Sequence, residues 1–437
     1  MRVLAFCCLS QLMIALDVSV VNIALPAIGA DLAFSATGLQ WVLNAYTIVL
    51  AGFLLLGGRA VDVWPARTVL TVGFAVFAGS SLLAGLAPDA GTLVAARALQ
   101  GLGDAIVAPA TLAVLTSAFS GPRERARALG AWAAASSCGA ALGLVTGGLL
   151  TQFAGWQWVF LVNVPAGLLA LVAARRVLPG EARRVRALDV PGAVTASAGL
   201  MALVYGTVHH DFRVLGVGSV LLLGFVLVEH RSAAPVLPLR VFRDGRLVLA
   251  NLVVLLLGCT MVSTWYFVTL QLQRVLGYGP AEAGFAFVPM AVTLVLCSRL
   301  AGRFVRVGPV LVLGLLLTGA GAALFALVTP GASYVPHVLV PMVTTAAGIG
   351  VAFVAATGAA TTGAEAGLAA GLVNTTRQVG AALGLAVLTV VATGGGYRAA
   401  LFGDAIAAGA GALVALGLSS ERRSRLPRAV NWHRRGF

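Results

Sequence analysis

The chain has 437 residues, of which 59% are hydrophobic and only 10% are charged, and its mean hydropathy is +0.98. Because a soluble domain carries about 25% charged and about 45–50% apolar residues, this composition excludes a water-soluble protein. A spanning helix needs about 20 apolar residues, so the length accommodates roughly a dozen or more crossings but no large catalytic domain. We therefore expect an all-α polytopic membrane protein.

Fourteen apolar stretches follow one another along the chain, separated by short loops that contain Pro, Gly and Asp. Asp17 interrupts the first stretch and Pro26 ends it, so we interpret it as a spanning helix and not as a cleaved signal peptide. The stretches cover residues 4–27, 39–58, 68–87, 92–116, 127–150, 156–174, 190–208, 214–229, 247–271, 283–302, 308–328, 335–358, 366–393 and 399–418.

The net charge of +14 comes from 29 basic residues, all of them arginine. Binding to nucleic acid would need a solvated basic face, whereas these arginines lie in short gaps between apolar stretches. Cytoplasmic loops carry an excess of positive charge. With the N-terminus in the cytoplasm, 24 of the 29 arginines fall on that side, Arg213, Arg274 and Arg398 fall outside, and Arg97 and Arg377 lie within spans. We expect a multi-pass protein of the cytoplasmic membrane with both termini in the cytoplasm.

An internal repeat indicates two related halves. Residues 58–63 after the second stretch resemble residues 302–307 after the tenth. Such repeats are typical of transporters that rock around a central site. We predict 14 transmembrane helices, arranged as two pseudo-symmetric six-helix bundles with an inserted helix pair. The first bundle covers 1–175, the linker with two additional helices 176–246, the second bundle 247–418 and a basic cytoplasmic tail 419–437.

Ionisable residues lie inside the apolar stretches, where each costs about 2.5–3.5 kcal/mol on insertion scales. Asp17 and Arg97 are predicted at similar depth, so they can face one cavity. Steps of three, four and seven residues place Arg97, Gln100, Gly101 and Asp104 on one helix face. This face forms either a buried ion-pair network that only holds helices together, or a proton-linked site whose carboxylate changes protonation as an arginine approaches or withdraws.

The substrate cavity is predicted from polar and aromatic residues within spans. In the second half, Arg377 is flanked by Asn374 and Gln378, and a packing or snorkelling arginine is an equal alternative. The residues that we assign to the cavity are Asn22, Gln100, Trp265, Tyr266, Asn374 and Arg377.

We expect no cofactor, no metal and no enzymatic activity. His209, His210 and Asp211 are adjacent in a loop and cannot easily converge on one ion. The five cysteines lie in apolar stretches without metal-type spacing. Paired carboxylates or a histidine cluster near an interface, which a membrane-embedded enzyme would need, are not found in the loops.

Several segments resemble the fourteen-helix drug/proton antiporters of the major facilitator superfamily, the EmrB/QacA-type branch. Residues 16–26 (LDVSVVNIALP) resemble the first-helix signature, and residues 97–103 (RALQGLG) resemble the fourth-helix motif, whose arginine is implicated in proton coupling. Residues 277–289 and 371–380 resemble segments of the second half. The resemblance implies the superfamily fold, alternating access and export driven by a proton gradient.

Two motifs match the family only in part. Gly58, Asp62 and Arg67 match the gating motif, which implies a cytoplasmic latch, but residues 63–66 depart from it. The glycine-rich motif of the fifth helix appears at residues 143–148 without its usual proline, because Leu144 stands in the Gly-Pro step.

The resulting hypothesis is proton-coupled efflux of small amphipathic drugs or secondary metabolites by a monomer. Asp17 is the predicted proton-exchanging carboxylate, Arg97 modulates it electrostatically, and Asp104 is a further proton-coupling candidate or a partner for Arg97. The partners are then the substrate, protons and the lipid bilayer. The alternative is uptake or facilitated diffusion of a specific solute, which the missing proline permits.

Overall fold

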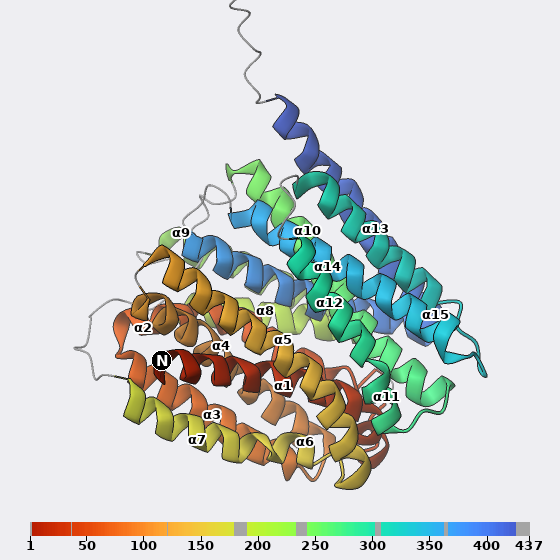
Figure 1. Cartoon of the computed structure of the whole chain (residues 1–437), viewed down its shortest axis with the longest axis horizontal. Coiled ribbons are helices and arrows are strands. Elements are labelled where there is room, and N and C mark those ends of the chain that lie inside the picture. The colour runs from red at the N-terminus through yellow and green to blue at the C-terminus, as the bar shows by residue number, and fades with distance from the viewer. Residues whose placement is uncertain are drawn as a thin grey trace, which may run out of the picture.

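The structure is a computed structural model that describes residues 2–35, 37–119, 121–178, 190–232, 243–301, 307–361 and 366–424. Its regular elements within these ranges are helices (Figure 1). The first nine are α1 (Arg2–Asp31), α2 (Trp41–Val63), α3 (Ala66–Gly85), α4 (Ala90–Ala118), α5 (Pro122–Phe153), α6 (Trp158–Leu161), α7 (Asn163–Val177), α8 (Val190–His209) and α9 (Phe212–Arg231). They are followed by α10 (Gly245–Leu270), η2 (Gln271–Val275), α11 (Pro280–Ala286), α12 (Val288–Ala301), α13 (Val307–Phe325), η3 (Val335–Leu339), α14 (Val340–Thr361) and α15 (Ala366–Ser424), where η2 and η3 are π-helical.

Within the described ranges, 12 helical segments are long and apolar enough to cross a membrane. The sequence predicts 14, and two features account for the difference. α2 contributes only the described run Trp41–Leu54, because the side chain of Leu55 lies outside what the structure describes. The last two predicted stretches form the single helix α15, in which Gly396 has a φ of 69°. Glycine adopts this left-handed conformation without strain, so Gly396 divides α15 into a first arm, 366–395, and a second arm, 397–424.

Local chemistry fixes where several helices begin. Before α4, the Asp89 carboxylate accepts hydrogen bonds from the Thr92 backbone N–H at 2.9 Å and from the Thr92 hydroxyl at 2.8 Å. These bonds satisfy a backbone donor that has no partner inside the helix. They also hold the pKa of Asp89 below its ordinary value. Pro122 and Pro280 occupy the first positions of α5 and α11, where a missing N–H costs nothing.

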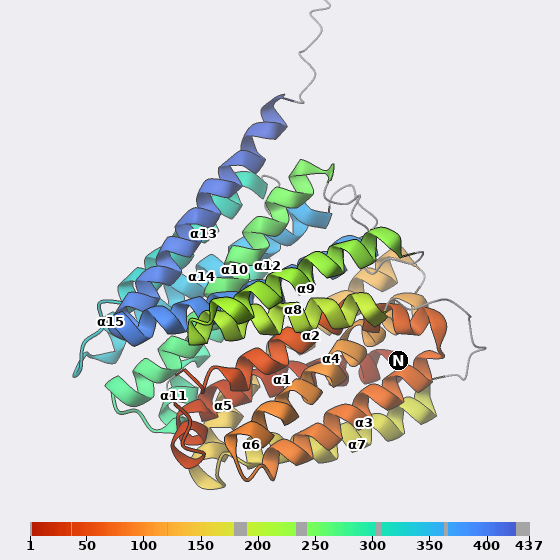
Figure 2. The same ribbon diagram turned by 180° about the vertical axis from the view of Figure 1, so that it is seen from behind.

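The helices pack into two groups. α1 packs on α5 and α7, and α4 packs on α2 and α3; in the other group α10 and α13 pack on α15, and α14 packs on α12 and α13 (Figure 1). α8 and α9 form a hairpin that lies against α2 and α15, as seen from behind in Figure 2. Ile48, Val204 and Ala386 belong to one buried cluster there. The hairpin therefore covers the junction between the two groups.

Glycines on α5 bring this helix against the backbone of α1. A Cβ at Gly139, Gly143 or Gly147 would lie only 2.3, 2.7 or 2.7 Å from a carbonyl oxygen of α1. The three glycines are spaced by four residues and share one face, so the two backbones approach along two turns.

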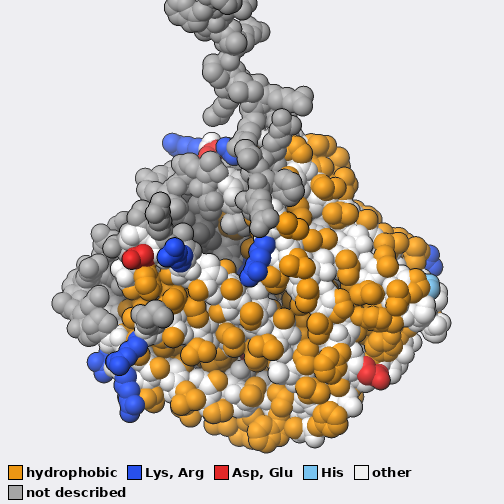
Figure 3. Space-filling model, in the orientation of Figure 1, with side chains coloured by type: hydrophobic (Ala, Val, Ile, Leu, Met, Phe, Trp, Pro, Cys, Tyr) orange, Lys and Arg blue, Asp and Glu red, His pale blue; other side chains and the backbone are white. Residues whose placement is uncertain are grey.

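The outer surface is apolar. The visible face of the molecule is almost continuously hydrophobic, and the described basic side chains on it lie mostly toward the end at which α1 begins (Figure 3). Leu169 and Phe212 are 71% and 83% exposed. A soluble monomer rarely shows an apolar patch of more than a few hundred Å², so lipid is the fitting solvent for this surface.

The buried core differs between the two ends of the molecule. At one end a single cluster contains residues of both groups, including Leu25 and Phe160 of the first and Phe267 and Phe287 of the second. At the end where α1 begins, the described residues form two separate clusters. Among the described residues, a common apolar core therefore joins the two groups at one end, and the smaller cluster with Ile48 and Ala386 also contains residues of both groups.

Replacing Gly139 with alanine should destabilise the protein. The added Cβ must displace the α1 backbone, and overpacking of this kind costs about 1–3 kcal/mol. Gly130 of the same helix is the matched control, because a Cβ there meets nothing within 4 Å and Gly→Ala improves helix propensity by about 1 kcal/mol. Thermal unfolding of purified protein should show a lower midpoint for Gly139→Ala and an unchanged or higher one for Gly130→Ala. Equal midpoints would contradict the close packing of α1 and α5.

Candidate functional site

Arg97 of α4 makes the only salt bridge found among the described residues. Its Nη1 donates to Asp17 Oδ2 of α1 at 3.1 Å, and both side chains are buried. The same nitrogen donates to Gln100 Oε1 at 2.6 Å, and Nε donates to the Val42 carbonyl of α2 at 3.0 Å. The prediction that Asp17 and Arg97 lie at similar depth is confirmed, and the guanidinium ties α4 to both α1 and α2.

The second carboxylate oxygen of Asp17 accepts hydrogen bonds from two side-chain amides. Asp17 Oδ1 accepts from Gln100 Nε2 at 2.7 Å and from Asn163 Nδ2 at 2.6 Å. Gln100 Nε2 also donates to the Ser81 hydroxyl of α3 at 2.9 Å. We call Asp17, Arg97, Gln100, Asn163 and Ser81 the Asp17 network. All five are at most 1% exposed, so the network is sealed between α1, α3, α4 and α7.

Asn163 and Ser81 are not among the site residues predicted from the sequence. Asn163 is an amide in an otherwise apolar stretch, and it is the first residue of α7, directly after the break at Val162 that separates α6 from α7. That polar residue was an available signal. Ser81 gave none, because serine is common in membrane helices as a packing residue.

Tyr46 of α2 links the arginine to the second carboxylate. The Arg97 guanidinium carbon lies 4.4 Å from the Tyr46 ring centroid, and the Tyr46 hydroxyl donates to Asp104 Oδ2. Asp104 was predicted as a possible partner for Arg97, but the structure gives Arg97 to Asp17 and Asp104 to Tyr46. Asp104 Oδ1 is buried without a hydrogen-bond partner in the described part of the chain.

The charges of this region do not balance when both acids are ionised. Two buried carboxylates lie here, and among the described residues only Asp17 is paired with an arginine, whereas Asp104 is bonded to Tyr46. An uncompensated charge at bilayer depth is costly, so a proton bound to one of the two carboxylates would lower this cost.

The predicted latch residues lie at the end of the molecule where α1 begins. Gly58 is in α2 and Arg67 is exposed in the first turn of α3. The side chain of Asp62 and residues 302–306 of the second repeat lie outside what the structure describes. The latch stays a prediction.

The residues predicted for a substrate cavity lie in different surroundings. Gln100 belongs to the Asp17 network, and Asn22 is buried with an unpaired side-chain oxygen. Arg377 donates to Asn374 at 2.8 Å. Tyr266 lines a 60 Å³ cavity. The indole N–H of Trp265 is buried and finds no partner among the described residues.

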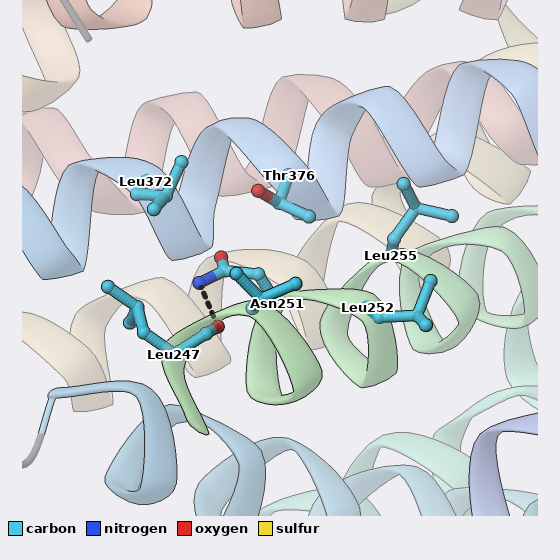
Figure 4. A pocket seen from close by; sticks show the side chains of 7 residues that line it. Leu247, Asn251, Leu252, Leu255, Leu372 and Thr376 are labelled. Carbon is cyan, nitrogen blue, oxygen red and sulfur yellow. Dashed lines mark hydrogen bonds between the residues drawn. The ribbon is translucent and has the colours of Figure 1, made fainter. Parts of the chain in front are cut away.

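Two larger cavities lie between helices. One of about 510 Å³ separates α5 from α12 and is lined by small and apolar residues such as Ala134 and Val295, with Arg299 at its border. The other, of about 250 Å³, lies between α10 and the first arm of α15, where Leu252, Leu255 and Leu372 surround it and Asn251 turns its amide back to the Leu247 carbonyl (Figure 4). The larger one has the size of a small-molecule site, about 300–1,000 Å³.

A second buried carboxylate site lies in the other group of helices. Asp404, in the second arm of α15, accepts hydrogen bonds from Ser263 and Thr264 of α10 at 2.9 and 3.2 Å. Asp404 is not among the site residues predicted from the sequence. An acidic residue inside the apolar stretch 399–418 was the signal that could have identified it.

Comparison with known families identifies the fold. A family model described as Major Facilitator Superfamily matches residues 7–385. The chain belongs to the Major Facilitator Superfamily. The crystal structure of the POT family transporter PepTSo superposes with a TM-score of 0.75 at 15% identity, over 97% of this chain and 99% of that chain. This superfamily member is thus a multi-pass membrane protein with the superfamily fold.

Two relatives within the superfamily carry informative names. The cephamycin export protein CmcT of Amycolatopsis lactamdurans is 42% identical over 90% of this chain and 85% of its own length. The puromycin resistance protein pur8 of Streptomyces alboniger is 41% identical over 88% of this chain and 80% of its own length.

Removing the buried arginine should destabilise this superfamily member strongly. In Arg97→Met, Asp17 keeps its amide donors but loses its counter-charge, and breaking a buried ion pair from one side costs about 3–5 kcal/mol. The double variant Arg97→Met/Asp17→Asn should recover part of the loss, because no unpaired charge is left. The exposed Arg67→Met should stay within about 0.5 kcal/mol. Denaturant unfolding in detergent measures these variants together with the single variant Asp17→Asn, and additive effects of Arg97→Met and Asp17→Asn would argue against the coupling.

Proposed function

We propose that this superfamily member is a proton-coupled exporter of small amphipathic compounds in the cytoplasmic membrane. The observation that carries the proposal is the buried cluster in which Arg97 is paired with Asp17 while the second carboxylate, Asp104, is bonded to the uncharged Tyr46, so that one bound proton would neutralise it. The names of the relatives, one an export protein and one a resistance protein, support the direction. No cofactor enters the mechanism, and the working unit is one chain with its substrate, protons and lipid.

We propose that the chain crosses the membrane fourteen times with both termini in the cytoplasm. The break at Gly396 supports counting α15 as two crossings, and α2, at 23 residues, is long enough for one. Residues 1–175 and 247–418 would then form six-helix bundles, with α8 and α9 as the inserted pair between them and a basic tail after 418. The placement of 24 of the 29 arginines on one side supports the orientation.

With this orientation, we assign the structure to a conformation that is closed at the outer end and open at the cytoplasmic end. The end with the common apolar core becomes the outer end, and the end with two separate cores becomes the cytoplasmic end. A transporter closed outside and open inside is ready to receive substrate from the cytoplasm. The cavity of about 510 Å³ between α5 and α12, one helix from each bundle, is the path that we assign to the substrate.

Proton binding can be coupled to bundle movement through the contacts of Arg97. When Asp17 is ionised, Arg97 and the amides of Gln100 and Asn163 hold α1, α4 and α7 together. A proton on Asp17 removes the charge that attracts the guanidinium, so Arg97 is free to turn toward Asp104 behind Tyr46. The helices that meet at Asp17 then lose one fixed contact, which permits rearrangement.

Replacing Asp17 with asparagine should abolish the response of transport to a pH gradient. One pH unit supplies about 1.4 kcal/mol per coupled proton, which corresponds to about tenfold accumulation. Everted vesicles with an acidic interior should accumulate puromycin or cephamycin with the unchanged protein, about tenfold for each coupled proton, and Asp17→Asn should lose this gain.

Asp89→Asn is the matched control, because Asp89 is an exposed acid that caps α4 and asparagine is also a good cap. If Asp17→Asn keeps full coupling, Asp17 has no part in it. Loss of drug from the same vesicles on acidification would favour the alternative, uptake of a specific solute.

Locking the outer end should stop transport. The Ala281 backbone N–H of α11 donates to Gln152 Oε1 of α5 at 3.0 Å, and a Cβ at Gly148 would lie 2.4 Å from the Pro280 carbonyl, so the bundles touch here. Cysteines at 152 and 281, in a background in which the five free cysteines are alanine, should form a disulfide that blocks transport, and reduction should restore it. Each single cysteine is the control. Full transport by the oxidised pair would contradict opening at this end.

A further inference from the structure

Asp404 is a fully buried carboxylate that the proposed transport mechanism does not yet use. It is 0% exposed, as are the two hydroxyl groups bound to it. Ser263 Oγ donates to Asp404 Oδ1 at 2.9 Å and Thr264 Oγ1 donates to Asp404 Oδ2 at 3.2 Å. Ser263 also contacts the Cys259 carbonyl. Each carboxylate oxygen is thus met by one hydroxyl of α10.

No cation balances Asp404 among the described residues. α10 presents the Cys259 thiol to it and carries Tyr266 further along, while α13 and α14, which belong to the same group of helices, contain no charged side chain. In α15 itself, Arg377 is bonded to Asn374, and Arg398 is exposed with its guanidinium carbon 5.8 Å from the Phe402 ring centroid. An ionised carboxylate without a partner at this depth is costly, so Asp404 needs a bound cation or a proton.

The position of Asp404 mirrors that of the Asp17 network. In the first bundle a carboxylate on the first helix, Asp17, is bonded to Asn163 near the start of the last helix. In the second bundle hydroxyls on the first helix, α10, are bonded to a carboxylate near the start of the last helix, two turns after Gly396. In each bundle, one buried carboxylate therefore joins the first helix to the last helix by hydrogen bonds. This comparison rests on the two-bundle arrangement proposed above.

The chemistry of the partners favours a proton over a metal ion. A hydroxyl both donates and accepts, so Ser263 and Thr264 can turn to satisfy Asp404 with or without its proton. Arg97 can only donate, so it favours the ionised form of Asp17. A sodium ion would need several further oxygen ligands, and the close contact of Ser263 with the Cys259 carbonyl leaves that oxygen engaged.

We propose that Asp404, with Ser263 and Thr264, is a second proton-binding site, so that each bundle carries one exchangeable proton. One proton would bind at the Asp17 network in the first bundle and the other at Asp404 in the second bundle, on opposite sides of the interface between the bundles. Coupling two protons to each substrate molecule gives a steeper dependence of export on the pH gradient than the Asp17 network alone.

Infrared difference spectroscopy of the full chain in lipid vesicles tests the site without any substrate. Spectra recorded between acidic and alkaline buffer should show the carbonyl-stretch band of a protonated carboxyl that disappears at alkaline pH. Asp404→Asn should remove this band, and Asp404→Glu should restore a shifted one. Ser263→Ala should move the midpoint of the change. The control Ser298→Ala removes a hydroxyl bonded to the Gly350 carbonyl in the same bundle and should change nothing.

Three results would overturn the proposal. A band that is absent in the unchanged protein means that Asp404 is never protonated. A band that persists unchanged at every pH means a fixed structural hydrogen bond. A band that sodium chloride removes, but choline chloride does not, assigns the site to sodium.

The number of protons coupled to the export of each substrate molecule tests the second site independently. Because each coupled proton contributes about tenfold accumulation per pH unit, Asp404→Asn should lower the steady-state puromycin ratio about tenfold at a gradient of one unit. An unchanged ratio would overturn the second proton. If the unchanged protein does not respond to the gradient, the proposed proton coupling fails, whereas the infrared band still reports on Asp404.

Discussion

A charge placed inside a lipid bilayer has to be neutralised within the protein, and this constraint organises the interior of the molecule. Removing a charge from water costs several kcal/mol even after the surroundings relax. Arg97 is fully buried and meets this cost through one carboxylate, one amide, one backbone carbonyl and the face of Tyr46. Its contacts come from α1, α2 and α4, so neutralising a single guanidinium fixes the relative positions of three helices.

Helices can meet at these charges only because their backbones come close together. Lipid provides no hydrophobic drive for helix association, and small residues supply the contact area instead. Gly101 of α4 faces the Tyr46 carbonyl, Gly143 of α5 faces the Leu16 carbonyl, and Gly258 of α10 faces the Arg377 carbonyl. The same glycines that permit tight packing therefore place Tyr46, Asp17 and Arg377 at their depths. Packing and electrostatics cannot be separated in this molecule.

The two halves of the chain surround a buried carboxylate with different kinds of hydrogen-bond donor. The first surrounds its carboxylate with a cation and amides, which favour the ionised form, whereas the second offers hydroxyls that suit either form. The common apolar core joins the halves at one end, so changes in either carboxylate act on helices that also line the junction. In the proposed mechanism, a rocking movement of the halves is coupled to both sites in this way.

The sequence by itself determined the helices and the depth of their charges. Apolar stretches with arginine between them predict membrane helices because lipid accepts little else, and the spacing of Arg97, Gln100 and Asp104 places them on one face because a helix repeats every 3.6 residues. Tertiary structure alone decided the partners. Asn163, Ser81 and Tyr46 lie on other helices, and no pattern local to them indicates which carboxylate they reach. The merging of two predicted spans into α15 depends on the conformation of Gly396, and the pairing of Asp404 with Ser263 depends on how α10 packs against it. Periodicity acts along one helix, whereas hydrogen bonds between helices depend on their rotation and approach, which only the packed fold fixes.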